Sequence, residues 1–141
     1  RPHTAVLDIC KWGADDGDQK MKSRYYPHID KAKVFGDHYV RDFSEHSRGV
    51  AVDVSLLYAK TGKPVDMGGH HDLLDPSSTT DSTLVTPSQR RNRMILKTAF
   101  EKQGFANYAP EWWHYRLLNE PEPTLHYYFP VWDGMTSAGR P

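Results

Sequence analysis

A chain of 141 residues with a hydrophobic fraction of 38% has the size and composition of one globular domain. The 18 basic residues balance 18 acidic ones, which argues against a nucleic-acid binder, because such proteins carry a basic excess. No apolar run approaches the roughly 20 residues that cross a bilayer, so no membrane span is expected. The single cysteine, Cys10, excludes an internal disulfide and a cysteine zinc knuckle, whereas eight histidines favour imidazole chemistry or metal binding.

The N-terminal part of the sequence predicts one helix followed by a loop. Pro2 suits the first turn of a helix, where its missing N–H costs nothing. Apolar residues then recur at helical spacing until Gly13 ends the pattern. These positions are Val6, Ile9, Cys10 and Trp12. Residues 14–31 are polar and interrupted by Tyr-Tyr-Pro, so they are expected to form a loop.

A strand is predicted from Val50 onward, because apolar side chains alternate along the chain there. The positions on one face are Val50, Val52, Val54 and Leu56. Turn residues at 60–64 and the short segment 65–67 predict a second strand that returns as an antiparallel hairpin. Residues 75–88 are polar and form a loop long enough to border a site.

The helix with the strongest signals begins at Thr86 and Pro87 and ends near Gly104. Its inward face is expected to carry Arg91, Met94, Ile95, Thr98 and Ala99. Residues 110–118 are aromatic and predict a further strand. These elements together predict an α+β fold, an antiparallel β-sheet flanked by helices, in a single domain over residues 1–141.

Two side chains that can bind a metal stand seven positions apart in the predicted strand region. Gly49 lies between His46 and Asp53, and because glycine adopts backbone angles closed to other residues, the chain can bend there. The bend would bring an imidazole nitrogen and a carboxylate oxygen together, a set that suits zinc. A capping or core histidine with a turn aspartate is the other interpretation, and this segment alone does not exclude it.

A second motif places Glu111 three residues before His114. Pro110 interrupts strand pairing just before Glu111 and permits a twist that turns both side chains toward one place. His114 could then supply a third ligand while the glutamate stays off the metal, as catalytic zinc sites require. The alternative is a pair of core tryptophans, Trp112 and Trp113, with polar residues at their rim.

Together the motifs His-x6-Asp and Glu-x-x-His resemble the zinc signature of the D-alanyl-D-alanine dipeptidases. The segment "SEHSRGVAVD" at 44–53 is similar to the family block S-x-H-S-R-G-x-A-x-D, and "EWWHY" at 111–115 is similar to the second block. Three further segments are similar to family segments in the same order: "YYPHID" at 25–30, "MGGHHDLLD" at 67–75 and "QRRNR" at 89–93. The resemblance covers nearly the whole chain and implies the wider D,D-peptidase and Hedgehog-like zinc fold.

This resemblance also implies the roles of single residues. One zinc ion per site would be held by His46, Asp53 and His114, with Glu111 as the catalytic base.

Three further positions carry over from family segments. The start "RPHTAV" resembles the family stretch R-P-x-x-A-V, which implies that Arg1 steadies the developing oxyanion. Asp72 falls where the family has a carboxylate that receives the α-ammonium of the substrate, and Ser44 matches a serine near the same pocket. A solvated loop aspartate and a turn or N-cap serine are the alternatives for these two residues. Arg48 is expected to form a structural salt bridge.

The implied activity is hydrolysis of the D-Ala-D-Ala dipeptide. The alternatives are a zinc D,D-carboxypeptidase or peptidoglycan endopeptidase of the same fold, and a non-catalytic, Hedgehog-like zinc-binding domain. In the family a further segment precedes the arginine, so the chain is expected to be the C-terminal portion of the domain or to act with a companion N-terminal fragment. A cytoplasmic location is expected from the lone cysteine, with the periplasm as the alternative and an oligomer left open.

Overall fold

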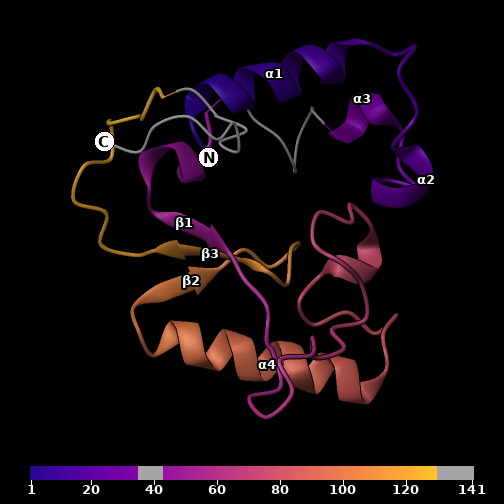
Figure 1. Cartoon of the computed structure of the whole chain (residues 1–141), viewed down its shortest axis with the longest axis vertical. Helices are drawn as coiled ribbons and strands as arrows, with labels where there is room; N and C mark the ends of the chain where they lie inside the picture. The colour runs from indigo at the N-terminus through magenta and orange to yellow at the C-terminus, as the bar shows by residue number, and fades with distance from the viewer. Residues whose placement is uncertain (35–42, 130–141) are drawn as a thin grey trace, which may run out of the picture.

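The structure is a computed structural model that describes residues 1–34 and 43–129. Three short strands form one antiparallel sheet in the order β1-β3-β2. Figure 1 shows α1 at one end of the molecule, α4 at the opposite end and the sheet between them. The elements in chain order are α1 (His3–Ala14), α2 (Lys22–Tyr25), α3 (Lys31–Lys33), η2 (Glu45–Arg48), β1 (Ala51–Asp53), η3 (Pro76–Ser78), α4 (Pro87–Glu101), β2 (Phe105–Asn107) and β3 (His114–Leu117). The expected α+β class with an antiparallel sheet is confirmed.

The predicted N-terminal helix is confirmed as α1, which Pro2 caps in an extended conformation. Val6 is buried on its inner face. The expected loop at 14–31 is wrong in part, because it contains α2 and its end forms the start of α3. Lys31 explains the packing of this region: its buried ammonium lies over the ring of Trp12 and donates hydrogen bonds to the carbonyls of Asp15 and Asp18. Helices this short leave no apolar period in the sequence.

The hairpin expected between the strand after Val50 and residues 65–67 is confirmed only in part: the chain returns antiparallel, with the Tyr58 N–H donating to the Lys63 carbonyl and the Val65 N–H to the Leu56 carbonyl, but no second strand forms. Only an isolated bridge joins Leu57 to Pro64, while β1 pairs instead with β3. Val52, expected on the inner face, is 39% exposed.

Helix α4 begins as predicted, with a capping box formed by Thr86 and Gln89 and with Pro87 in its first turn. Its predicted inner face is wrong, because the five expected residues are exposed: Arg91, Met94, Ile95, Thr98 and Ala99. The buried positions are Arg93 and Leu96. Arg93 faces inward because its Nε and Nη1 donate to the carbonyls of Met67, Ser77 and Thr79, which offsets part of the cost of burying its charge.

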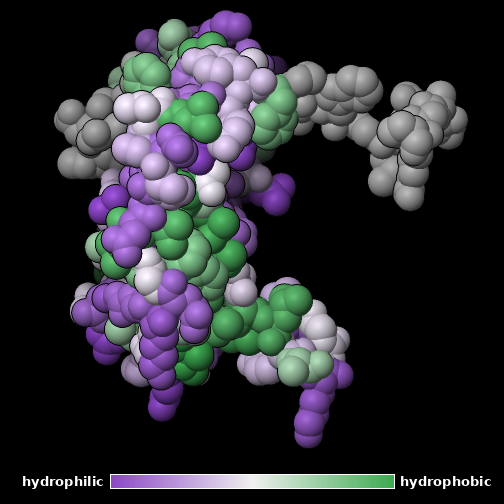
Figure 2. Space-filling model, turned by 90° about the vertical axis from the view of Figure 1, so that its left-hand side faces the viewer, coloured by the Kyte–Doolittle hydropathy of each residue, from purple (hydrophilic) through white to green (hydrophobic). Residues whose placement is uncertain are grey.

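The core lies where α4 packs against the sheet. It consists of Met67, Leu96, Trp112, Trp113 and Tyr115. Further apolar residues are buried elsewhere, among them Val6, Tyr26 and Val34. Apolar side chains also remain at the surface, among them Ile95 and Leu118, and Figure 2 shows such side chains gathered over the middle of the face in view. Within residues 1–34 and 43–129, no helix combines the length and the apolar character that a membrane crossing requires.

Candidate active site

The bend expected at Gly49 exists and turns the chain from η2 into β1. Gly49 has φ 74°, in the left-handed region, and its N–H donates to the carbonyls of Glu45 and His46. At the other end of η2 the Ser44 hydroxyl accepts a hydrogen bond from the His46 N–H. These two caps define a single turn that directs His46 back toward the strand that follows.

Strand pairing brings the other two expected ligands together. In the register of β1 and β3, Asp53 lies directly opposite His114. Directly opposed residues of an antiparallel pair project to the same face, so the carboxylate and the imidazole meet although 61 positions separate them. Residues 110–118 do not form one strand as predicted, because the chain turns before β3 begins at His114. This turn places Glu111 on the same side as His114.

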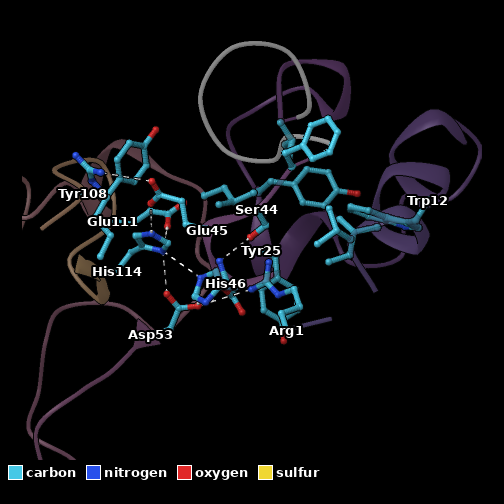
Figure 3. A pocket seen from close by; sticks show the side chains of 18 of the residues that line it. Arg1, Trp12, Tyr25, Ser44, Glu45, His46, Asp53, Tyr108, Glu111 and His114 are labelled. Carbon is cyan, nitrogen blue, oxygen red and sulfur yellow. Dashed lines mark hydrogen bonds and ion pairs between the residues drawn. The ribbon is translucent and has the colours of Figure 1, made fainter. Parts of the chain in front are cut away.

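The three expected metal ligands converge on one point (Figure 3). His114 Nδ1 lies 3.1 Å from Asp53 Oδ1 and 3.2 Å from His46 Nε2. His46 Nε2 lies 3.3 Å from Asp53 Oδ2. A tetrahedral zinc ion with bonds of ~2.0–2.1 Å keeps its ligand atoms about 3.3 Å apart. The residues therefore fit zinc both in spacing and in their mixture of two imidazole nitrogens and one carboxylate oxygen.

The electrostatics of the cluster also suit a cation. Burial would raise the pKa of Asp53, but hydrogen bonds from His114 and His46 outweigh it and hold the pKa well below its usual range. Burial would lower the pKa of His114, but the hydrogen bond that it donates to Asp53 and the charges of Asp53, Glu111 and Glu45 raise it. The site thus concentrates negative charge around the imidazoles, which a divalent cation would neutralise.

Glu111 lies beside this cluster but outside it. Its side chain is 11% exposed, and Oε2 is 3.7 Å from His114 Nδ1. Burial raises the pKa of Glu111 to about 7, with the charges of Asp53 and Asp72 acting in the same direction and those of His114 and Arg1 opposing them. A carboxyl group in this state can both accept and release a proton near neutral pH.

The remaining expected residues line the same cavity of about 1210 Å³: Arg1, Ser44 and Asp72. Arg1 Nη2 lies 3.7 Å from Asp53 Oδ2, so Arg1 contacts the cluster of His46, Asp53 and His114. The Ser44 hydroxyl caps η2, as its alternative interpretation expected. Asp72 has φ 61°, which marks a constrained backbone position in a loop at the cavity wall.

Sequence reasoning missed two groups near the cluster. Glu45 Oε2 lies 3.7 Å from His114 Nε2, on the opposite side of that ring from the other ligands. The Tyr108 ring packs against the His114 ring with centroids 5.7 Å apart. Glu45 precedes His46 in the sequence, but its approach to His114 depends on long-range packing that the sequence does not show. The expected structural salt bridge of Arg48 is confirmed, with two of its nitrogens paired to Glu120.

Comparison with known proteins agrees with this geometry. Residues 1–132 match the sequence profile of the family described as D-ala-D-ala dipeptidase. The D-alanyl-D-alanine dipeptidase of Streptomyces coelicolor is 42% identical over 131 residues, which is 93% of this chain and 65% of the relative. That of Enterococcus faecalis is 37% identical over the same shares of both chains. The chain thus spans about 65% of the length of these relatives. It belongs to the D-ala-D-ala dipeptidase family of peptidases.

Proposed function

We propose that this chain carries the catalytic site of a zinc-dependent peptidase that hydrolyses the D-Ala-D-Ala dipeptide. The observation that carries the proposal is the convergence of His46, Asp53 and His114, with the Glu111 carboxyl group 3.7 Å from the nearest ligand nitrogen. The names of the relatives support the same substrate. The single cysteine suits a reducing compartment, and we therefore place the activity in the cytoplasm.

In this proposal, the three ligand residues hold the zinc ion and Glu111 transfers the proton. Zinc, when bound, supplies a Lewis acid that acidifies a water molecule and polarises the carbonyl of the scissile bond. Glu111 accepts the proton of the attacking water and passes it to the leaving amine, and its pKa of about 7 suits both transfers. Because the side chain is buried, the proton stays on the carboxyl group between these steps and is not lost to bulk water.

Arg1 and Asp72 act on the charges of the substrate. The Arg1 guanidinium stands by the metal cluster, where it can share the negative charge that develops on the carbonyl oxygen. Asp72 lines the cavity, and its negative charge raises the pKa of Glu111, so the two carboxyl groups interact electrostatically. It would bind the free ammonium of a dipeptide, and a peptide extended at that end would leave this carboxylate unpaired.

A second candidate is a zinc D,D-carboxypeptidase or peptidoglycan endopeptidase. The cavity of about 1210 Å³ favours it, because pockets for small ligands span roughly 300–1,000 Å³. Turnover of D-Ala-D-Ala is therefore to be compared with turnover of a peptide ending in D-Ala-D-Ala. Cleavage of the longer peptide alone would replace the dipeptidase by this second activity.

The decisive test uses Glu111→Gln, which keeps the shape of the side chain and removes its basicity. We expect the variant to retain one zinc per chain by metal analysis and to lose about 10²–10⁴-fold in kcat on D-Ala-D-Ala. Glu101→Gln, on the exposed face of α4, is the matched control and should behave as wild type. Full activity of Glu111→Gln would overturn the base assignment, and a wild-type protein that binds zinc without turnover would point to a non-catalytic zinc-binding domain.

A further inference from the structure

The proposed mechanism gives no role to Glu45, a carboxylate beside the metal ligands. Glu45 is the first residue of η2 and lines the same cavity as the metal ligands. His114 presents Nδ1 to Asp53 and His46, so the other nitrogen of its ring, Nε2, points away from the cluster. Glu45 Oε2 lies on that side, 3.7 Å from Nε2, and Figure 3 shows Glu45 beside the ring.

The two oxygens of Glu45 face different partners. Oε1 lies 3.4 Å from Arg48 Nη2 and 3.8 Å from Arg116 Nη1, whereas Oε2 faces His114. Arg48 is itself fixed by Glu120, which contacts two of its nitrogens. The arginines therefore anchor one oxygen and leave the other directed at the imidazole. A hydrogen bond is several tenths of an ångström shorter than 3.7 Å, a difference that a small rotation of the glutamate side chain closes.

The chemistry of a neutral imidazole gives this contact a consequence. Such a ring carries one N–H, and a nitrogen that binds a metal must present its lone pair. If His114 binds through Nδ1, its proton is on Nε2, where a carboxylate can accept it. Partners of this kind fix the tautomer and the ring orientation of a ligand histidine and increase its basicity, and their loss typically costs about 10–100-fold in metal affinity.

We infer that Glu45 is a positioning residue that accepts the Nε2–H of His114 and thereby presents Nδ1 to the metal. This inference rests on the proposed function in taking zinc as the metal. It does not depend on which substrate is hydrolysed.

The test measures zinc affinity by competition with a chelator for three substitutions at this position. Glu45→Gln keeps the reach and an acceptor oxygen, whereas Glu45→Asp keeps the charge near Arg48 and loses the reach. We expect Glu45→Ala and Glu45→Asp to weaken zinc binding about 10–100-fold, and Glu45→Gln to retain most of the affinity. Glu101→Ala, an exposed glutamate on α4, is the control and should bind zinc as wild type does.

A second readout follows the His114 ring directly. In the zinc-loaded wild type, nitrogen NMR should show a proton on Nε2 of His114 that exchanges slowly with solvent, and this protection should be lost in Glu45→Asp. The inference would be overturned if zinc affinity depended on the charge at this position. In that case Glu45→Asp would bind zinc as wild type does, and Glu45→Gln would bind it as weakly as Glu45→Ala. Affinities within twofold of wild type for all three variants would also overturn it.

Failure of the proposed function has a different signature. A wild-type protein that binds zinc and shows the expected order of variants, but does not cleave D-Ala-D-Ala, would remove the activity and keep the role of Glu45. A wild-type protein that binds no zinc would overturn both.

Discussion

A substitution at Asp72 tests the proposed selectivity for a free substrate amine without disturbing the backbone. The Asp72 φ of 61° lies in the left-handed region, which asparagine tolerates about as well as aspartate. Asp72→Asn should therefore keep the loop and remove only the charge. Asp72 is exposed, and an exposed ion pair contributes up to about 1 kcal/mol, so we expect KM for D-Ala-D-Ala to rise by up to about fivefold while kcat changes little.

The measurement is steady-state kinetics with the free dipeptide and with its N-acetylated form. The variant should lose most of its preference for the free amine. Asp81→Asn serves as the control, because the Asp81 side chain is 81% exposed and lies on the loop before α4. An unchanged KM in Asp72→Asn would show that this carboxylate is the solvated loop residue of the alternative interpretation.

Single residues that meet in the candidate site could be picked out from the sequence where they stand in compact motifs. His46 and Asp53 flank a glycine that bends the chain, and Glu111 and His114 flank a turn, so local reasoning indicated the chemistry of both pairs. Glu45 was missed because its role depends on which ring nitrogen of His114 faces the cluster. No sequence pattern reports that orientation.

At the level of secondary structure, Gly49 joins η2 to β1 and sets the direction of His46. Alanine in its left-handed conformation costs about 1–2 kcal/mol of stability. A Cβ there would meet the ring of Tyr127 at 3.6 Å, an ordinary contact, so the cost is conformational and not steric. We expect Gly49→Ala to lower the free energy of unfolding by this amount in urea denaturation, and to weaken zinc binding as well because His46 shifts.

Gly62 provides the matched control for this substitution. It also has a left-handed backbone, φ 65°, and a Cβ there would meet nothing within 4 Å. Gly62→Ala should lose a similar free energy of unfolding and leave zinc affinity unchanged. Equal zinc affinities in the two alanine variants would contradict the role of Gly49 in directing His46.

Asp75 connects the segment around His28 with the start of η3. Its lowered pKa predicts the pH range in which this contact stabilises the fold. The carboxylate accepts hydrogen bonds from the Ser77 N–H and from His28 Nδ1. Burial alone would raise the pKa of Asp75, but the bonds from His28 and Ser77 outweigh it and lower the pKa below the ordinary 3.8. Because the folded-state pKa is depressed, this stabilisation is present above about pH 3.8 and is lost as the pH falls further.

Asp75→Asn should therefore lower the free energy of unfolding by about 1.5–3 kcal/mol at pH 7, a typical value for hydrogen bonds to a charged group. The difference from wild type should shrink as the pH falls below about 3.8. Urea denaturation at several pH values measures this difference. A gap that stays constant down to pH 2 would show that the charge of Asp75 contributes nothing to stability.

Local sequence signals were sufficient to predict the start of a helix but not the pairing of a strand. The start of α4 follows from Thr86 and Pro87, whose capping role is complete within one turn. The partner of β1 does not follow, because β3 lies far along the chain and competes with the nearby segment 65–67. The buried face of α4 was also missed, since Arg93 is inward only because distant carbonyls accept from it.

On the scale of the whole molecule, the proposed metal cluster joins segments that are far apart in the sequence. Its ligands come from η2, from β1 and from β3, and Arg1 extends the cluster to the start of α1 (Figures 1 and 3). The three polar side chains lie within 3.1–3.3 Å of one another and are partly removed from water. A bound cation would satisfy all three at once, so metal binding should be coupled to global stability.

This coupling gives a quantitative expectation. A ligand that binds only the folded state stabilises it by RT ln(1 + [L]/Kd), about 4.1 kcal/mol at a free concentration of 1,000 Kd. We expect the thermal midpoint of the wild type to rise with added zinc and to return to its starting value on chelation. His46→Ala should abolish most of the rise, because only two ligands remain. His28→Ala removes an exposed histidine outside the cluster and should keep it. A zinc-dependent rise of equal size in His46→Ala would mean that the metal stabilises the fold from somewhere other than the cluster between β1 and β3.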